Sequence, residues 1–266
     1  MTEDIVVVGV GNELLDGRTV NTNLAWLGKR LEDEGYSIAR SLILRDDVSE
    51  LSRQISDIVR YKPRVLILTG GLGPTWDDVT LQGLARALHV KLVLSRVALR
   101  MIRSRIRGKL TAERKKMAFL PEGSKPLKNN KGTAPGVYAR KGATRIVALP
   151  GVPEEMMDLF DRQVLNVIRG SLRKEMRVTG RMTVKGVPEA DLAPMVGEVK
   201  EAVSGVYIKS HVKYSEVGLS PIEVFFSCRG RRPAHHVEEA MTSLRTLVNA
   251  SGGSTRIRSS PPSSTR

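Results

Sequence analysis

The stretch TGGLGPTWDDVT, residues 69–80, decides how the first half of this chain is interpreted. Three glycines and a proline come first, and two neighbouring aspartates follow them. The aliphatic run at 64–69 is a predicted buried strand, and apolar residues recur at helical spacing from Val79 to Leu88. A glycine-rich turn between a strand and a helix predicts a ligand loop at the carboxyl edge of a parallel sheet.

Strand-like and helix-like segments alternate on both sides of this loop. Predicted strands at 4–11 and 37–44 are each followed by an apolar helical stripe. After the loop, residues 136–151 predict a hairpin, and Pro153 suits the first position of a further helix. Such alternation predicts βαβ units. We therefore expect an α/β fold, a doubly wound and mostly parallel sheet covered by helices on both faces.

A second, smaller unit is predicted after Arg177, with strand, helix, strand, strand and helix in that order. We expect a first domain over residues 1–172 and a small βαββα domain over 176–250. Residues 251–266 are rich in Ser, Pro and Gly and show no apolar periodicity, so they predict a disordered tail.

Composition restricts the class of protein. Hydrophobic residues make up 41% of the 266 residues, which suffices for an ordinary core. No apolar run approaches the roughly 18–20 residues of a membrane span, and the N-terminus lacks the basic region of a secretory signal. Cys228 is the only cysteine, which fits a reducing compartment. We expect a cytoplasmic protein with no membrane partner.

The net charge of +15 is concentrated in residues 96–145, where 15 Lys and Arg residues face only Glu113 and Glu122. A local field of this kind attracts phosphates or acidic partners. The alternative is a solvated helix face whose arginines keep the protein soluble.

The opening stretch combines two chemistries. Its glycines let main-chain N–H groups approach a phosphate, but Trp76 stands at the third glycine position of a dinucleotide fingerprint. A tight turn with a helix cap is the alternative. A carboxylate beside a phosphate is repulsive unless a cation lies between them, and Mg²⁺ accepts one or two carboxylates with phosphate oxygens. Asp78 has capping-box spacing from Thr75, which would leave Asp77 for the metal, although the roles could be reversed.

Four motifs in order carry a resemblance to a known family: GNELLDGRTVNTN at 11–23, TGGLGPTWDDVT, GTAPG at 132–136 and LPGVPEEM at 149–156. Together they resemble the molybdopterin-binding (MoaB/Mog-like) domain over residues 5–169, and more closely its version in the competence/damage-inducible CinA family. KGVPEADLA, at 185–193, resembles the small KH-like domain of CinA proteins. Nothing resembles the C-terminal amidase domain of bacterial CinA, so we do not expect nicotinamide-nucleotide deamidation.

The resemblance implies a homo-oligomer that binds a phosphate-bearing small molecule, either a nucleotide or a pterin. CinA-type domains are associated with metal-dependent hydrolysis of ADP-ribose, so hydrolysis of a diphosphate-linked nucleotide is the first expectation. Molybdopterin binding or adenylylation in molybdenum cofactor assembly is the alternative. Trp76 departs from the family pattern and would stack on a base or shield the site. The basic residues at 128–131 depart from it too and would favour a more highly charged ligand.

Candidate site residues follow from the matching motifs. The resemblance implies catalytic roles for Asp77, Asp78 and Glu13, with Mg²⁺ or another divalent cation on the two aspartates. Lys128, Lys131 or an arginine of the basic segment would neutralise the phosphates. The implied ligand-binding residues are Gly70, Gly71, Gly73, Thr75, Asn23, Gly132, Thr133, Pro135, Gly136, Pro150 and Gly151.

Nucleic-acid binding is the rival function from another class. The basic segment and the KH-like resemblance favour it. Only Phe119 and Tyr138 are aromatic within 96–145, too few for a stacking platform, and the small unit lacks the GxxG loop of KH domains. Nucleic acid is therefore not the expected partner. His235 and His236 are adjacent and point to different helix faces, so no histidine metal site is expected.

Overall fold

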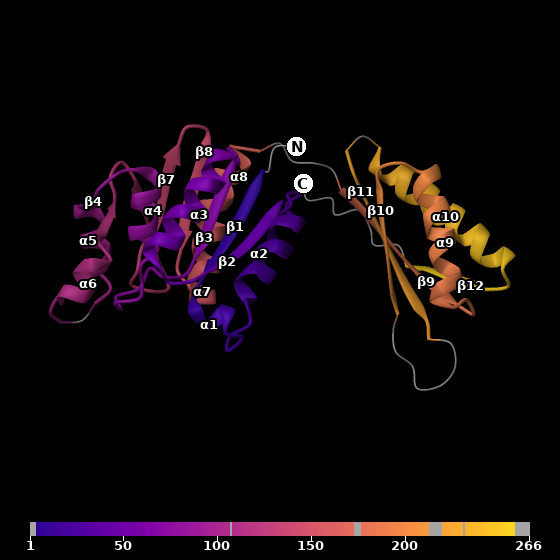
Figure 1. Ribbon diagram of the computed structural model, residues 1–266, viewed down its shortest axis with the longest axis horizontal. Helices are drawn as coiled ribbons and strands as arrows, with labels where there is room; N and C mark the ends of the chain where they lie inside the picture. Colours follow the sequence, from indigo (N-terminus) through magenta and orange to yellow (C-terminus); the bar gives the residue numbers. More distant parts are fainter. Residues whose placement is uncertain (1–3, 107, 173–176, 213–219, 231, 259–266) are drawn as a thin grey trace. The chain divides into compact units, whose positions relative to one another are not determined.

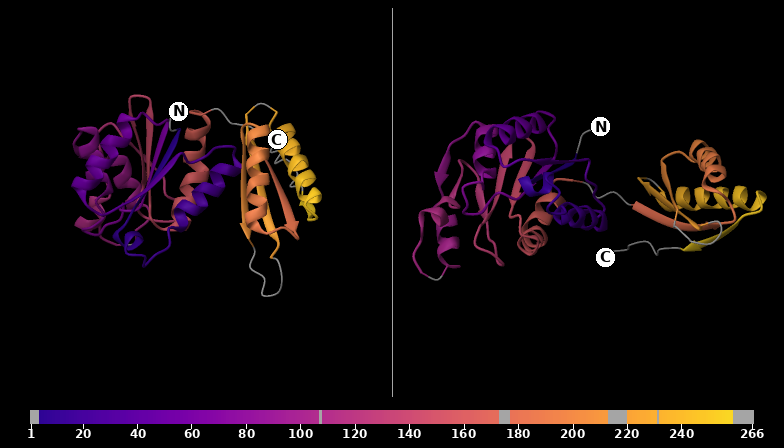
Figure 2. Two further views of the ribbon diagram at one scale, coloured as in Figure 1. Left: turned by 45° about the vertical axis from the view of Figure 1, so that its right-hand side comes forward. Right: turned by 60° about the horizontal axis from the view of Figure 1, so that its bottom comes forward.

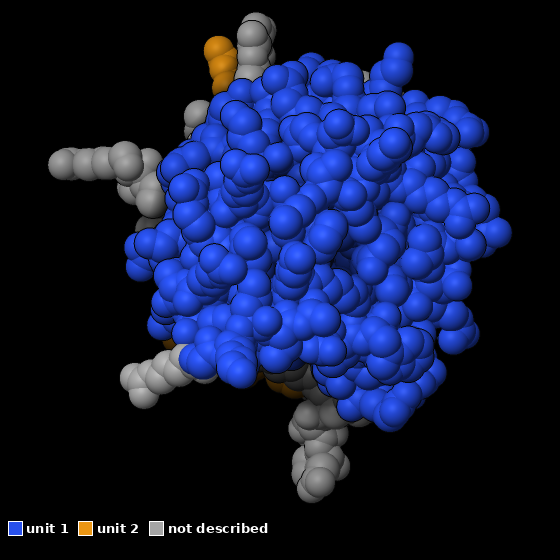
Figure 3. Space-filling view, turned by 90° about the vertical axis from the view of Figure 1, so that its left-hand side faces the viewer, with its two compact units in different colours: residues 1–173 blue, residues 174–266 orange. Residues whose placement is uncertain are grey.

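The computed structural model describes residues 4–106, 108–172, 177–212, 220–230 and 232–258 (Figure 1). The chain divides into two compact units, residues 1–173 (unit 1) and 174–266 (unit 2), coloured separately in Figure 3. Within the described ranges, no helix combines the length and the apolar character that crossing a membrane requires.

Unit 1 is built on a six-stranded sheet in the order β2-β1-β3-β8-β7-β6. The four neighbours β2, β1, β3 and β8 are parallel, and β7 is antiparallel to both β8 and β6. This confirms the predicted α/β fold with a mostly parallel sheet. The strands are β1 (Ile5–Val10), β2 (Arg40–Leu44), β3 (Val65–Thr69), β6 (Lys125–Leu127), β7 (Gly136–Lys141) and β8 (Thr144–Leu149).

Helices cover both faces of this sheet, because its central strands are apolar on both sides (Figures 1 and 2). In β1, Val6 and Val8 pack in one core cluster, whereas Ile5 and Val7 pack in the other. The first cluster includes residues of α3 (Val48–Arg60), α4 (Thr80–Leu88) and α5 (Arg96–Arg103). The second includes residues of α2 (Thr22–Asp33), α7 (Pro153–Leu159), the π-helical turn η1 (Phe160–Val164) and α8 (Leu165–Arg169).

The most basic part of the chain, between α4 and β6, forms a small two-stranded sheet with two helices outside the main sheet. Its strands β4 (Leu92–Leu94) and β5 (Phe119–Pro121) pair antiparallel with each other. Between them lie two basic helices, α5 and the short α6 (Ala112–Lys116). The basic residues of α6 lie next to the glycine loop, because the Lys116 ammonium group donates a hydrogen bond to the Thr75 carbonyl oxygen.

Unit 2 is a four-stranded antiparallel sheet in the order β10-β11-β9-β12. Its elements are β9 (Arg177–Lys185), α9 (Glu189–Ala202), β10 (Val206–Val212), β11 (Ile222–Arg229), α10 (Pro233–Ala250) and β12 (Ser254–Arg258). The prediction of a disordered tail from residue 251 is wrong for Ser254–Arg258, which pair with β9 through their backbone. Residues 254–258 form a strand because their backbone pairs with β9, and they show no apolar periodicity that would have predicted it. Residues 259–266 lie outside the described residues.

Candidate functional site

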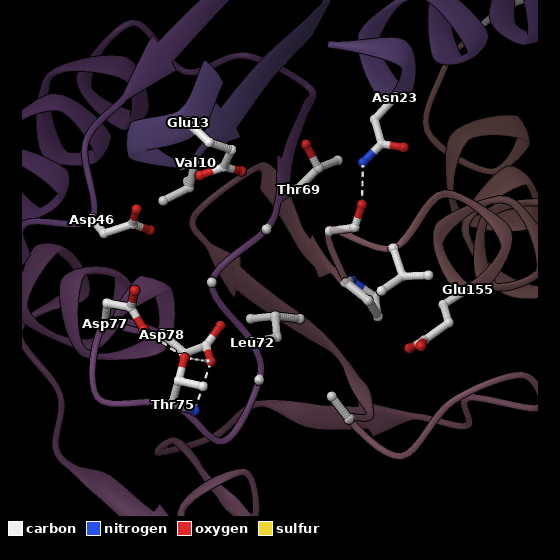
Figure 4. Close-up of a pocket in the computed structure, with 18 of the residues that line it drawn as sticks. Val10, Glu13, Asn23, Asp46, Thr69, Leu72, Thr75, Asp77, Asp78 and Glu155 are labelled. Atoms are coloured by element: carbon white, nitrogen blue, oxygen red, sulfur yellow. Dashed lines mark hydrogen bonds between the residues drawn. The ribbon is translucent and has the colours of Figure 1, made fainter. Parts of the chain in front are cut away.

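A cavity of about 670 Å³ opens in unit 1 where the carboxyl ends of the parallel strands meet (Figure 4). Val10 ends β1 and Thr69 ends β3, and Pro150 follows β8; all three line the cavity. The short helix α1 (Asn12–Leu15) follows β1 at the same edge. Ligands of open α/β folds bind at this edge, so the sheet places the cavity where the sequence predicts a ligand site.

Thr80, the first residue of α4, anchors the glycine loop through two hydrogen bonds. Gly70 and Gly71 have φ angles of 103° and 64°, which a glycine adopts without strain. The Thr80 hydroxyl donates to the Gly70 carbonyl oxygen at 2.8 Å, and the Thr80 N–H donates to the Gly71 carbonyl oxygen at 3.2 Å. Thr80 is fully buried, so this pair of bonds fixes the path of the loop.

The amide groups of the loop divide into two kinds. The Gly70 N–H donates to the Leu149 carbonyl oxygen at 3.0 Å, so it is used inside the sheet and does not serve a ligand. Within the described residues, the N–H groups of Gly71, Leu72 and Gly73 have no protein acceptor, and all three residues line the cavity. Consecutive unengaged amides in a glycine loop are suited to binding an anionic oxygen.

Asp77 and Asp78 belong to a turn that precedes α4. The helix begins at Thr80, and its N-cap residue, Val79, provides no side-chain cap, so the predicted capping box at the helix start is wrong. Asp78 instead closes the turn, since its Oδ2 accepts from the Thr75 N–H at 2.8 Å. The Thr75 hydroxyl lies 2.5 Å from both Asp77 Oδ1 and Asp78 Oδ2. The hydrogen bond from Thr75 lowers the pKa of Asp77, helped by the Asp77 backbone N–H, and keeps that carboxylate ionised.

Asp46 lies near these carboxylates, although no sequence motif predicts a role for it. It follows β2, lines the cavity, and accepts a hydrogen bond from the Asn12 N–H at 2.9 Å. Burial raises the pKa of Asp46, the bond from Asn12 opposes that rise, and the charges of Glu13, Asp77 and Asp78 add to it. Figure 4 shows all four carboxylates on one side of the glycine loop. We call Glu13, Asp46, Asp77 and Asp78 the acidic cluster.

The acidic cluster fits a metal ion that the ligand helps to hold. Within the part of the chain that the structure describes, no three His, Cys, Asp or Glu side chains form a metal-binding group by themselves. Mg²⁺ does not need such a group, because it accepts one or two carboxylates and completes its shell with phosphate oxygens and water. Asp77 and Asp78 therefore fit a cation that binds together with a phosphate rather than before it.

Replacing Asp46 with asparagine is expected to stabilise the ligand-free protein at pH 7. The folded-state pKa of Asp46 is raised above that of a free aspartate, so ionisation of Asp46 costs stability as the pH rises through the raised pKa. Asparagine removes this cost and can still accept the Asn12 N–H. Thermal unfolding should show Asp46→Asn above wild type at pH 7, with the difference shrinking toward pH 4. The exposed Glu122→Gln variant is the control, and an equal gain at both pH values would contradict the explanation.

On the other side of the glycine loop, Asn129 shapes the GTAPG segment. Asn129 is 5% exposed, and its amide donates to the Ala134 carbonyl oxygen at 2.8 Å and to Glu155 Oε2 at 2.7 Å. Its Oδ1 accepts from the N–H groups of Lys131 and Gly132. These bonds hold Ala134 at the cavity wall. No local sequence pattern predicts a role for Asn129 or Glu155, because their role depends on tertiary contacts.

Asn23 connects α2 to the loop after β8. Its amide nitrogen donates to the Gly151 carbonyl oxygen at 2.8 Å. The Asn23 Oδ1 is buried and has no hydrogen-bond partner within the described residues. Through its amide nitrogen, Asn23 positions Gly151 at the cavity wall.

The structure brings most of the predicted site residues together at the cavity, and leaves some outside it. Trp76 is 89% exposed and is absent from the lining, as are Lys128 and Lys131. Arg114 of α6 is the one basic side chain in the lining that the structure describes. The predicted residues in the lining are Glu13, Asn23, Gly70, Gly71, Gly73, Thr75, Asp77, Asp78, Thr133, Pro150 and Gly151. Those outside it are Gly132, which packs on Glu155, Pro135, and Gly136, which lies inside β7.

Comparison with known proteins gives matches over more than nine-tenths of the chain and over most of unit 1. Residues 6–170 match a family described as "Probable molybdopterin binding domain". A protein of Metallosphaera sedula is 40% identical over 248 residues, which cover 92% of each chain. A protein of Aeropyrum pernix is 40% identical over 255 residues, 93% of this chain and 94% of the relative. Among solved structures, the protein CinA of unknown function from Thermoplasma acidophilum is 37% identical with a TM-score of 0.58, and covers 62% of this chain and 98% of its own.

Proposed function

This chain belongs to the family described as a probable molybdopterin-binding domain, and we propose on that premise that its cavity binds a phosphate-bearing small molecule. We propose further that, as a CinA-type member, it hydrolyses a diphosphate-linked nucleotide such as ADP-ribose with the help of a divalent cation. The likeness to the CinA protein of Thermoplasma acidophilum supports this choice within the family.

One observation carries the proposal: unengaged amides and a cluster of carboxylates line the same cavity. The N–H groups of Gly71, Leu72 and Gly73 suit an anion, whereas Asp77 and Asp78 would repel it. A cation shared between carboxylates and phosphate removes the conflict, and it is the arrangement used for diphosphate chemistry. A site that only bound an anion would gain nothing from the acidic cluster.

The residues of the cavity have distinct roles in this proposal. The loop amides and Arg114 would hold non-bridging phosphate oxygens. Asp77 and Asp78 would hold Mg²⁺ or a similar ion, which supplies charge neutralisation and Lewis acidity. Asp46 would accept a proton from the attacking water, since its raised pKa suits a general base, and Glu13 is the other candidate. A bond forms between the water oxygen and one phosphorus, the bridging P–O bond breaks, and AMP and ribose 5-phosphate leave.

Incubation with ADP-ribose tests the proposal directly. The purified full chain with MgCl₂ or MnCl₂ is expected to release AMP and ribose 5-phosphate in equal amounts, resolved by ion-exchange chromatography. Because the ion offsets the repulsion between the acidic cluster and the diphosphate, EDTA should abolish the release. A heat-denatured sample is the control for contaminating turnover. No AMP with any divalent ion tested would reject the hydrolase.

The second candidate is molybdopterin binding or adenylylation, which the description of the family favours. The same amides would then hold the pterin phosphate. An adenylyltransferase would consume ATP only when the pterin is present and would retain a pterin product, whereas the proposed hydrolase needs no pterin. Fluorescence of oxidised pterin released from the purified protein separates the two candidates.

The remaining expectations extend the proposal to the whole chain. We propose that the protein acts in the cytoplasm as a homo-oligomer. We also propose that unit 2 corresponds to the small KH-like domain of CinA proteins. The relatives from Metallosphaera sedula and Aeropyrum pernix support a shared two-unit organisation, because each match extends over more than nine-tenths of the chain.

A further inference from the structure

Unit 2 covers only one face of its sheet with helices (Figures 1 and 2). Met182, Val224 and Phe226 point to the helix side and pack with residues of α9 and α10. The strand register places the alternate residues on the opposite side, where Arg181 and Lys209 both pair with Phe225. No described element of unit 2 covers this second side. We call it the open face, and define it by Thr179, Arg181, Thr183, Lys185, Tyr207, Lys209, Phe225 and Arg256.

The charges of unit 2 are divided between its two layers. Helices α9 and α10 carry the acids Glu189, Asp191, Glu198, Glu201, Glu238 and Glu239 against the bases Lys200 and Arg245. On the open face, Arg181, Lys185, Lys209 and Arg256 are exposed. Glu223 is the one acidic residue that the described register places on that side. Because the exposed basic residues lie on the sheet and most acidic residues lie on the helices, the electrostatic field of the open face attracts a polyanion.

Two aromatic side chains lie among these basic groups. Tyr207, on β10, is 57% exposed, and Phe225, on the adjacent β11, is half-buried. Tyr207 pairs with Ser227, two residues from Phe225, so Tyr207 and Phe225 occupy diagonal positions on one face, where such positions lie roughly 7–8 Å apart. The Arg177 guanidinium lies over the Phe225 ring, 5.9 Å from the ring centroid. Nucleic-acid bases stack on aromatic rings and on guanidinium planes.

We propose that the open face of unit 2 binds single-stranded nucleic acid, with Tyr207 and Phe225 stacking on bases and Arg181, Lys185, Lys209 and Arg256 contacting phosphates. A duplex hides the faces of its bases, so a single strand is the form that the aromatic pair recognises. A hollow of about 410 Å³ lies at this part of unit 2 and is lined by Lys185 and Arg256 together with Glu223.

This inference is independent of the cavity in unit 1 and differs from the expectation drawn from the sequence. That expectation looked for aromatic residues in the basic segment 96–145 and for a GxxG loop. The topology instead places the aromatic and basic residues on one side of a sheet, where Lys209 and Arg181 lie opposite each other across Phe225 of β11 although 28 positions separate them in the chain.

Fluorescence anisotropy with the full chain provides the test. The probes are fluorescein-labelled r(U)10, d(T)10 and a 10-base-pair duplex at low salt. We expect binding to one or both single strands and weaker binding to the duplex, with affinity falling steeply as salt rises. The two single strands distinguish RNA from DNA, and a preference for either supports the proposal.

Matched variants connect the binding to the open face. Tyr207→Ala is expected to weaken binding about 5- to 100-fold through lost stacking. Tyr61→Ala, which removes an equally exposed aromatic ring from unit 1, should change it less than twofold. Arg181→Gln with Lys209→Gln should reduce the salt slope by about 1.4. Lys200→Gln with Arg245→Gln, on the helix layer, should leave the slope unchanged. Phe225→Leu keeps an apolar side chain at a half-buried position while removing the ring, and it should also weaken binding.

Several results would overturn the proposal. Absence of binding to both single strands at low salt is the first. Equal effects of Tyr207→Ala and Tyr61→Ala would mean that the ring on the open face takes no part. Displacement of the RNA by polyglutamate of matched charge as effectively as by unlabelled RNA would identify an acidic protein segment as the occupant instead. Circular dichroism of each variant shows whether unit 2 remains folded.

Discussion

Replacing Gly70 with alanine is expected to destabilise unit 1 by about 3–5 kcal/mol, the sum of backbone strain and steric overlap. Gly70 has a φ of 103°, which L side chains rarely adopt, and a Cβ there would lie 2.2 Å from the Val10 carbonyl oxygen. That oxygen belongs to the backbone of β1, so it cannot yield as a flexible side chain would. Urea unfolding followed by tryptophan fluorescence measures the effect on unit 1 selectively, because Trp26 and Trp76 both lie there.

Gly142→Ala is the matched control for this prediction. Gly142 also has a positive φ, 57°, in the turn between β7 and β8, but no atom lies within 4 Å of its Cβ position. It should cost about 1–2 kcal/mol, the penalty of the left-handed conformation alone. Equal destabilisation by the two variants would show that the approach of Gly70 to β1 contributes nothing.

Replacing Asp77 and Asp78 together with asparagine is expected to lower ADP-ribose turnover by at least about 100-fold, because the cation then loses its protein ligands. Asparagine keeps the shape of both side chains, and its Oδ1 at position 78 can still accept the Thr75 N–H that closes the turn. The loop should therefore persist, and the melting temperature should change little. AMP release at saturating Mg²⁺ is the measurement.

The control for the double variant removes two negative charges elsewhere. Asp33→Asn with Glu122→Gln changes the net charge equally at exposed positions outside the cavity. This control should retain wild-type turnover. If Asp77→Asn with Asp78→Asn also retained it, neither aspartate would hold the metal and the hydrolase assignment would fail. A titration of Mg²⁺ against the residual rate distinguishes weaker metal binding from a slower chemical step.

The sheet of unit 1 was predictable because its central strands are buried on both faces. Such strands have nearly unbroken apolar sequences, as in Val65–Thr69, and the glycine loop at the end of β3 marks the carboxyl edge. Asp77 and Asp78 follow the glycine loop at that edge, whereas Glu13 was expected at the site only from the resemblance of residues 11–23 to the family motif.

The residues that the sequence did not reveal depend on contacts between distant segments. Asp46 also follows a strand, but the neighbouring Asp47 caps α3, and this helix-capping pattern is the one that the sequence makes recognisable. Asn129 bonds to Glu155, 26 positions away, and no local periodicity encodes such a pair. The edge strand Ser254–Arg258 is held by its register with β9, whereas its composition is that of a loop.

The peptide groups of Gly71, Leu72 and Gly73 at the cavity wall have a consequence for how this scaffold can change. A wall of main-chain groups keeps its chemistry whatever side chains its neighbours carry. Under the proposed function, substitutions at exposed lining residues such as Val152 would therefore alter which organic group is admitted, while the main-chain groups would still hold the phosphate. If the proposed phosphate site is confirmed, protein engineers would have a fixed main-chain anchor around which to build selectivity for new metabolites.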